Sequence, residues 1–167
     1  MSYYNPILSR GLGRFAADAH EAGVDGLIVP DLPAEESDEL IAALDSAGID
    51  LIFLVAPTTP DDRLQVIAAR ARGFIYCVSL TGVTGARQSL PDDLPAYLAR
   101  VRKHTDLPLA VGFGVSRPDH VASLRGVADA AIIASAIIDR MDRADPPDRA
   151  ASLRAFAREM RVAADGT

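Results

Sequence analysis

Five short apolar runs recur along the chain, and they constrain its fold more than any other feature of the sequence. Each run follows Gly, Asp or Pro. A strand with one solvent-exposed face would alternate between polar and apolar residues, and these runs do not. A strand that is apolar on both faces is buried on both faces, as in a parallel sheet covered by helices. The runs span residues 26–29, 51–55, 74–78, 109–111 and 130–133.

Amphipathic helical stretches separate these runs. Acidic residues lie in the first turns of one of them, where the helix dipole favours anions, and Pro-Asp-Asp begins another. Strict alternation of strand and helix predicts one α/β domain over residues 1–167, with a parallel sheet and right-handed crossovers. The stretches are 10–22, 34–47, 60–70, 94–104, 117–124 and 150–163, and 140–149 is a polar segment outside this pattern.

The number of units leaves two architectures open. The runs are spaced by about 25 residues, and a (β/α)8 barrel uses about 30 residues per unit over ~250 residues. Five units and a strand stub at residues 1–4 fill the chain, which is too few for eight. The pattern therefore fits either an open doubly wound sheet or a barrel that lacks its beginning.

Charge and cysteine content exclude several classes of function. Lys plus Arg is 17 and Asp plus Glu is 23, a net charge of −6 without a basic cluster, which argues against binding to nucleic acid or an anionic membrane. The single cysteine, Cys77, lies in an apolar run, so we expect a buried, inert thiol and a reducing cytoplasm. No metal-ligand spacing is present, and His20, His104 and His120 fall in helical stretches, where we expect them to be exposed.

Three loops at the carboxyl ends of the predicted strands carry the residues of interest, because chemistry in such folds gathers there. Residues 79–87 hold two glycines and two threonines, which suit a lid or an anion-binding turn, or a plain flexible loop. Gly112-Phe113-Gly114 leads into a helix, so its amides could approach an oxyanion. Ser135 begins a second such turn, or simply caps a helix. Two such turns in consecutive units predict a phosphate site.

Two further residues have alternative interpretations. Asp31 lies between two prolines at a strand end, where it is either a functional acid or the cap of the helix that follows. Tyr76 lies within a strand, on the same face as Phe74 and Val78, and points either into a barrel or outward into a helix-covered core. Core packing is the commoner role for such a tyrosine.

Eight motifs together resemble the alpha subunit of tryptophan synthase, in order and at that family's spacing. The Thr-Gly-Val-Thr-Gly loop combined with the Gly-Phe-Gly turn is the most specific part, and the resemblance covers nearly the whole chain. The motifs are Tyr-Tyr-Asn-Pro at 3–6, Ala-Gly-Val-Asp-Gly at 22–26, Pro-Asp-Leu-Pro at 30–33, Ala-Pro-Thr-Thr-Pro at 56–60, Gly-Phe-Ile-Tyr at 73–76, Thr-Gly-Val-Thr-Gly-Ala at 81–86, Gly-Phe-Gly-Val-Ser at 112–116 and Ser-Ala-Ile at 135–137.

The resemblance implies a (β/α)8 TIM barrel, here incomplete, running from a stub of strand 3 through strand 8. It implies retro-aldol cleavage of indole-3-glycerol phosphate to indole and glyceraldehyde 3-phosphate in L-tryptophan biosynthesis, a lyase reaction. Indole then passes to a beta subunit, which carries pyridoxal phosphate, in a heterotetramer of two alpha and two beta subunits. No cofactor or metal is implied for this chain.

Site residues follow from the resemblance, motif by motif. Gly85, Gly112, Gly114 and Ser135 resemble the phosphate ligands, mostly through backbone N–H groups. Tyr76, Phe113, Ile28 and Leu54 resemble the walls of the indole pocket. Thr84 resembles the lid threonine that orients a catalytic aspartate, and Tyr3 and Asp31 match positions that line the active-site face. One departure is Ala134, where the family usually has Gly before the serine.

The front of the chain is the larger departure. The resemblance implies about a hundred more N-terminal residues, which would complete a barrel of eight units, with the catalytic glutamate and aspartate in its first two units. Neither group has a counterpart here, because Asp31, Glu35 and Glu36 do not match those positions. We therefore expect a chain that is inactive alone. The alternatives are a non-catalytic module that binds a phosphorylated ligand or docks on a beta subunit, and another phosphate-binding barrel, against which the Thr-Gly-Val-Thr-Gly loop argues.

Overall fold

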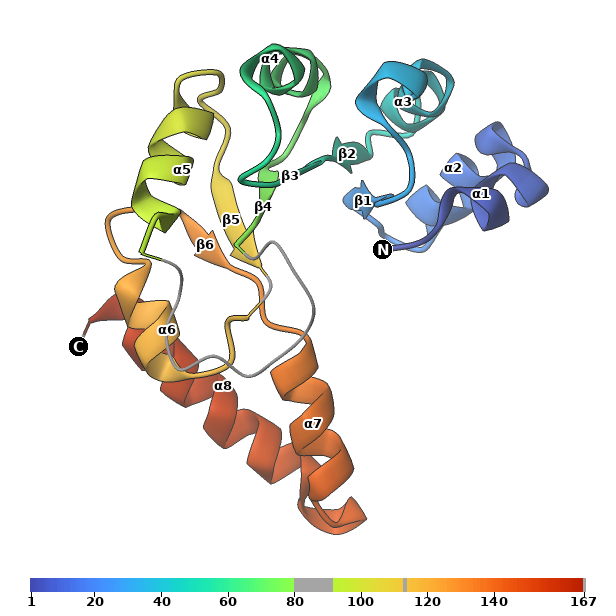
Figure 1. Cartoon of the computed structure of the whole chain (residues 1–167). Coiled ribbons are helices and arrows are strands. Elements are labelled where there is room, and N and C mark those ends of the chain that lie inside the picture. The colour runs from blue at the N-terminus through green and yellow to red at the C-terminus, as the bar shows by residue number, and fades with distance from the viewer. Residues whose placement is uncertain (80–91, 113, 167) are drawn as a thin grey trace.

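A parallel sheet runs through the centre of the molecule, as the apolar runs predict (Figure 1). The structure is a computed structural model, and it describes residues 1–79, 92–112 and 114–166. The strands are β1 (Gly26–Ile28), β2 (Asp50–Ile52), β3 (Leu54–Val55), β4 (Ile75–Val78), β5 (Leu109–Gly112) and β6 (Ala130–Ala131). All pairings are parallel, in the order β1-β2 and β3-β4-β5-β6.

The ladder pattern thus divides the strands into two sheets, β1-β2 and β3-β4-β5-β6. The two sheets are continuous because β2 and β3 belong to one run of chain, interrupted only at Phe53. The carbonyl of Phe53 accepts a hydrogen bond of 2.9 Å from the amide of Tyr76, which bridges the interruption. The strands therefore follow the sequence order from β1 to β6, as neighbouring units of a barrel do. The incomplete parallel barrel predicted from the sequence agrees with this arrangement.

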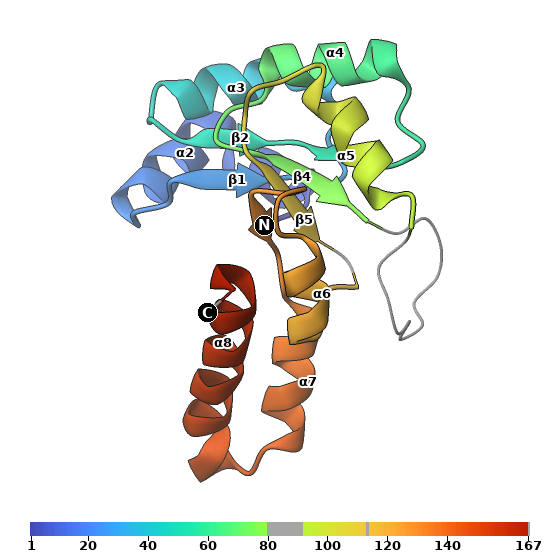
Figure 2. The same ribbon diagram turned by 90° about the vertical axis from the view of Figure 1, so that its left-hand side faces the viewer.

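Helices cover the outer face of the sheet and connect its strands. Figure 2 shows α3 and α4 on one side of the strands, while α7 and α8 extend away as an antiparallel pair. The helices are α1 (Tyr4–Arg10), α2 (Leu12–Glu21), α3 (Asp38–Asp45), α4 (Asp61–Arg70), α5 (Leu94–Arg102), α6 (Pro118–Ser123), α7 (Ser135–Arg143) and α8 (Arg149–Asp165), with short 3-10 turns η1 (Ala34–Glu36) and η2 (Pro146–Asp148).

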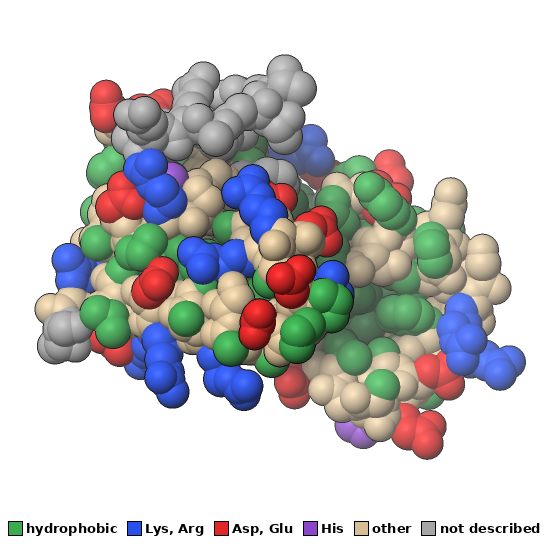
Figure 3. All heavy atoms as spheres, turned by 90° about the horizontal axis from the view of Figure 1, so that it is seen from below, with side chains coloured by type: hydrophobic (Ala, Val, Ile, Leu, Met, Phe, Trp, Pro, Cys, Tyr) green, Lys and Arg blue, Asp and Glu red, His purple; other side chains and the backbone are tan. Residues whose placement is uncertain are grey.

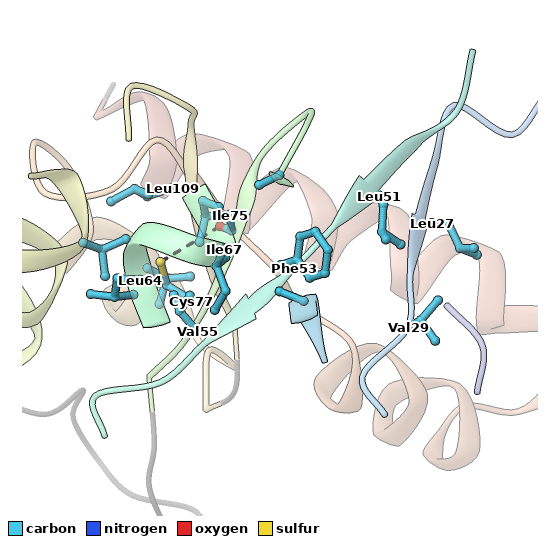
Figure 4. Packing of buried hydrophobic residues seen from close by; sticks show 14 of the residues in the cluster. Leu27, Val29, Leu51, Phe53, Val55, Leu64, Ile67, Ile75, Cys77 and Leu109 are labelled. Carbon is cyan, nitrogen blue, oxygen red and sulfur yellow. Dashed lines mark hydrogen bonds between the residues drawn. The ribbon is translucent and has the colours of Figure 1, made fainter. Parts of the chain in front are cut away.

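The hydrophobic core lies between the sheet and these helices (Figure 4). Val55, Ile75 and Cys77 project from the strands toward Leu64 and Ile67 of α4, and each of these side chains is at most 5% exposed. Strand side chains alternate between two faces, so every second residue of these strands points to the opposite side. That opposite side is the concave face of the incomplete barrel, and the predicted site residues of the strands lie on it.

Two sequence predictions fail at the ends of the pattern. The stub at residues 1–4 is not a strand, because α1 begins at Tyr4 and only the amide of Ser2 reaches β1, donating to the carbonyl of Ile28 at 3.1 Å. The polar segment 140–149 does not lie outside the helical pattern, since it contains the end of α7, the η2 turn and the first residue of α8. Tertiary contacts order both segments.

Candidate functional site

The strand register brings three predicted pocket residues to one face of the sheet. Ile28 is flanked by the core residues Leu27 and Val29, so its own side chain points to the concave face. Leu54 and Tyr76 are direct partners in the β3–β4 ladder and lie on that face for the same reason. An apolar wall therefore extends across β1, β3 and β4, near the carboxyl ends of the strands.

Tyr76 lies against Gly112, a contact that the sequence did not predict. A Cβ added to Gly112 would lie 2.1 Å from the hydroxyl oxygen of Tyr76, so the phenol ring occupies the space where a side chain at position 112 would be. Tyr76 is 5% exposed, and burial raises the pKa of its hydroxyl. It does not belong to the core cluster between sheet and helices. The concave-face interpretation of Tyr76 therefore holds over the core-packing one.

Ser79 fixes Gly112 from the neighbouring strand end. Its amide and its hydroxyl both donate to the carbonyl of Gly112, at 3.0 and 2.9 Å, and the side chain is 2% exposed. In the sequence this serine is recognisable only as the first residue of a loop. The signal available in the sequence was its place directly after a buried strand, where a hydroxyl can bond to a neighbouring strand end.

Gly114 needs the conformation that only glycine adopts readily. Its φ of +83° lies in the left-handed region, where a Cβ is unfavourable. The imidazole Nδ1 of His120 lies 3.0 Å from the carbonyl oxygen of Gly114 and 3.3 Å from the amide nitrogen of Ser116. The prediction that His120 is exposed is wrong: its side chain is 3% exposed, because it faces this turn instead of solvent. His20 is exposed as expected, and His104 is half-buried beside Asp61.

Ser135 is the first residue of α7, at the end of β6. The ladder places β6 beside β5, and the amide of Ile132 donates to the carbonyl of Val111 at 2.7 Å, so the segments that follow both strands start from the same edge. The N-cap is Ala134, not Ser135, so the alternative role of Ser135 as an N-cap is wrong. The first amides of a helix have no partner within it and can face an anion.

Ala134, the departure from the family pattern, has a φ of −126°, outside the left-handed region that favours glycine. The adjoining amides remain part of the helix start.

Asp31 does not cap the helix that follows it in the sequence, so that one of its two interpretations is wrong. Its carboxylate accepts the amide of Tyr4 at 3.0 and 3.2 Å, and it thereby caps the start of α1, not the helix that follows it in sequence. The neighbouring Tyr3 is 68% exposed. Asp31 and Leu54 also line a cleft of about 390 Å³ between η1 and α4, together with Thr58 and Arg63.

Three predicted site residues, Gly85, Thr84 and Phe113, lie outside the described residues. Over the described ranges there is no cluster of three or more His, Cys, Asp or Glu side chains that could hold a metal ion. No described helix is long and apolar enough to cross a membrane.

The comparisons with known proteins decide the family. The family model of the tryptophan synthase alpha chain matches residues 1–165. The chain belongs to the tryptophan synthase alpha chain family. The tryptophan synthase alpha chain of Roseiflexus castenholzii is 56% identical over 161 residues, which are 96% of this chain and 62% of the relative. That of Methanoregula boonei is 48% identical, over 99% of this chain and 63% of the relative.

Solved structures of the family have the same fold. A structure of the tryptophan synthase a2b2 complex from Pyrococcus furiosus superposes with a TM-score of 0.86 at 38% identity, covering 95% of this chain and 64% of that chain. Tryptophan synthase from Mycobacterium tuberculosis gives 0.86 at 36% identity, with coverages of 97% and 60%. The chain thus spans about 62% of the length of the curated relatives it matches.

Proposed function

We propose that this chain is the substrate-binding part of a tryptophan synthase alpha chain, and that it binds indole-3-glycerol phosphate without cleaving it on its own. One observation carries the proposal: the register places Ile28, Leu54 and Tyr76 on one face, with Gly112 directly against the Tyr76 hydroxyl. An apolar wall and a glycine turn meet at that point. Such a junction suits a ligand with a flat apolar ring and a phosphate.

The phosphate end of the ligand would lie at the ends of β5 and β6. Gly112 and Gly114 present backbone close to the site, and Ser135 adds the first-turn amides and partial positive charge of α7. Helix α7 has nine residues, whereas α6 has only six, so α7 supplies the larger dipole. Gly85 is the fourth proposed ligand, from the resemblance alone.

The indole end of the ligand would lie along the apolar wall. Leu54 and Tyr76 are adjacent across the ladder, and Ile28 extends the wall toward β1. Phe113 and the lid residue Thr84 complete the proposed pocket by resemblance. Aromatic and branched apolar side chains of this kind bind a flat ring chiefly by removing its surface from water.

Cleavage would need two carboxyl groups that we assign to the rest of a full-length relative. Retro-aldol cleavage requires an acid to protonate the indole ring and a base to take the proton of the glycerol hydroxyl. The carboxylate of Asp31 already accepts the Tyr4 amide, and its place at the start of α1 suits a structural role. We therefore propose that the lyase activity of the family is absent from this chain alone.

The proposed partner is a tryptophan synthase beta subunit, in the manner of the a2b2 complex from Pyrococcus furiosus. Pyridoxal phosphate would belong to that subunit, and no cofactor is assigned to this chain. The proposed compartment is the cytoplasm, with which a free, buried Cys77 is compatible. Titration with a purified beta subunit, followed by sedimentation, tests docking; an unchanged sedimentation profile and unchanged beta activity would contradict it.

A charge substitution tests the binding site itself. Ser135→Asp keeps the fold, because an acidic residue in the first turn of a helix is favourable, but its charge repels a phosphate. We expect titration calorimetry to show saturable binding of indole-3-glycerol phosphate to the unaltered chain and at least about tenfold weaker binding to the variant. The matched control, Ala150→Asp, adds the same charge to the exposed first turn of α8 and should leave binding unchanged. Equal binding by all three proteins would place the phosphate elsewhere.

A further inference from the structure

A buried histidine lies behind the turn to which the proposed phosphate site is assigned. His120 belongs to α6, and at 3% exposed it is one of the few polar side chains that the described part of the chain buries so fully. Neighbouring groups hold its backbone: the amide of His120 donates to the carbonyl of Arg117 at 3.1 Å, and the Ser123 hydroxyl donates to the carbonyl of His120 at 2.8 Å. The backbone that carries the imidazole ring of His120 is therefore held in place.

One nitrogen of this ring lies between two backbone groups of the β5–α6 connection. Nδ1 is 3.0 Å from the carbonyl oxygen of Gly114, to which it can donate. It is also 3.3 Å from the amide of Ser116, from which it can accept. A neutral imidazole nitrogen is either a donor or an acceptor, so either tautomer keeps one of the two bonds. In both cases the ring ties this connection to α6.

The connection is held at its other end by Ser79, whose amide and hydroxyl both bond to the carbonyl of Gly112. Buried side chains thus hold the backbone on both sides of the position where Gly114 adopts a φ of +83°. Glycine has the widest conformational freedom of any residue, so a glycine turn is ordered only if other contacts order it. A turn that binds an anion with backbone amides depends on that ordering, because amides bind well when already in place.

We propose that His120 is a positioning residue for the phosphate turn: its buried imidazole fixes the Gly114 carbonyl and the Ser116 amide, and so presets the backbone that meets the phosphate. The inference rests on the proposed function, since it deepens the same site. His120 touches no substrate atom in this proposal. It acts through the backbone alone.

The test compares two substitutions at position 120 with a matched core substitution. Asn places an amide near the position of Nδ1 and retains a hydrogen bond, whereas Leu fills a similar volume without one. Val121→Ala truncates a side chain that is 4% exposed on the same helix and belongs to the core cluster, so it destabilises the fold without removing this contact. The probe is inorganic phosphate, followed through the amide NMR signals of Gly112, Gly114 and Ser135.

We expect His120→Leu to weaken phosphate binding by between about 3-fold and 10-fold, the effect of one lost hydrogen bond. His120→Asn should recover most of that affinity, and Val121→Ala should bind phosphate as the unaltered chain does. Hydrogen exchange at the Ser116 amide should also become faster in His120→Leu and not in Val121→Ala. Equal affinity of His120→Leu and the unaltered chain would overturn the proposal while leaving the phosphate site intact.

A measurement on the unaltered chain needs no variant to fold. Nitrogen-15 NMR of the imidazoles reports the hydrogen bonding of each Nδ1, and phosphate should shift the His120 signal but not that of the exposed His20. A His120 ring that does not respond while the amides of Gly112 and Gly114 do would overturn the positioning role. If phosphate shifts the NMR signals of none of these amides, the proposed phosphate site is wrong, and this inference fails with it.

Discussion

At the scale of single residues, Gly112 carries the tightest steric constraint of the site. The Tyr76 ring fills the space of a side chain there, and the phenol carbon Cζ would lie 2.4 Å from an added Cβ. The glycine is thus required by a side chain of the adjacent strand β4 and not by its own backbone, since its φ is not in the left-handed region. This reason is invisible in the sequence, where position 112 is simply part of a Gly-x-Gly motif.

Gly112→Ala should therefore destabilise the chain by about 1–3 kcal/mol, the usual cost of overpacking a filled interior. Denaturant unfolding measures the change. The control is Gly13→Ala in α2, where an added Cβ meets nothing within 4 Å; that substitution should stabilise by about 0.5–1 kcal/mol, because Ala favours helix over Gly. A Gly112→Ala variant as stable as the unaltered chain would show that Tyr76 can leave this position freely.

Cys77 gives a second prediction at this scale. Burial raises the pKa of its thiol to about 12, and the side chain is 0% exposed. At pH 8 only about one thiol in ten thousand would be ionised, and the thiolate is the reactive form. We expect a disulfide reagent to label Cys77 only as fast as the chain unfolds, and at once in denaturant. Fast labelling under native conditions would contradict the burial of β4.

At the scale of elements, the strands were predictable and two helices were not. An apolar run needs no long-range information to be recognised as a buried strand. Helix α1 depends on such information, since its start is capped by Asp31, which is 27 residues away, and its residue Ile7 is 0% exposed. Helix α7 has no buried residue, and its Arg140 packs over the ring of Phe156 of α8 at 4.4 Å, so the contact with α8 stabilises this helix where it enters the polar segment 140–149.

The site was predictable to a similar degree. Ile28, Leu54 and Tyr76 share a face because strand alternation is a local rule, so the sequence could indicate it. The burial of His120 and the helix that Asp31 caps were not predictable, because their partners, the Gly114 carbonyl and the Tyr4 amide, are set by the fold. The family resemblance supplied candidate residues but no information about these contacts.

Helix α5 holds the loop between β3 and α4, which lines the cleft beside Asp31 and Leu54. The Arg100 guanidinium donates to the carbonyls of Thr59 and Pro57 at 2.7 and 2.8 Å and pairs with Asp61 at 2.9 Å. Replacing Arg100 with Met should destabilise the chain by about 1–3 kcal/mol, because it leaves these acceptors without their charged donor. Arg161→Met is the control: it removes one exposed pair in α8 and should cost less than about 0.5 kcal/mol. Thermal unfolding of both variants measures the difference, and equal losses of stability would show that Arg100 does not hold this loop.

The pH dependence of stability should include the carboxylate of Asp129. The backbone N–H of Leu109, at the start of β5, holds the pKa of Asp129 below its ordinary 3.8, against burial and with help from Arg102. A carboxyl whose folded pKa is lowered stabilises the fold above its unfolded pKa, and this contribution is lost as pH falls below 3.8 through the folded value. Asp129→Asn should therefore show a smaller fall in melting temperature between pH 6 and pH 2 than the exposed control Asp106→Asn. An identical fall in melting temperature for both variants would show that Asp129 does not contribute to the pH dependence of stability.

At the scale of the whole molecule, the sheet formed by the described strands has unpaired edges at β1 and β6. Within the described residues β6 pairs only with β5, and a groove of about 640 Å³ lies between β6 and α8, lined mainly by apolar side chains such as Ile133 and Phe156. Figure 3 views the molecule from below, the side toward which α7 and α8 extend in Figure 1, and shows hydrophobic side chains around a hollow on that side. Ile138 and Val162 are each 56% exposed. Open edges and exposed apolar surface favour association.

The isolated chain should accordingly associate or unfold at low stability. Sedimentation and thermal unfolding over a hundredfold range of concentration test this expectation, and the transition should move with concentration. A sharp transition of a monomer that does not depend on concentration would contradict it.

Incubating the purified chain with indole-3-glycerol phosphate, and measuring bound ligand and released indole in one sample, shows whether the chain binds this compound without cleaving it. We expect saturable binding, amide shifts at Gly112, Gly114 and Ser135, and no more indole than the buffer alone releases. Indole release that disappears in Asp31→Asn would contradict the proposed function, because it would place a catalytic carboxylate in the chain itself.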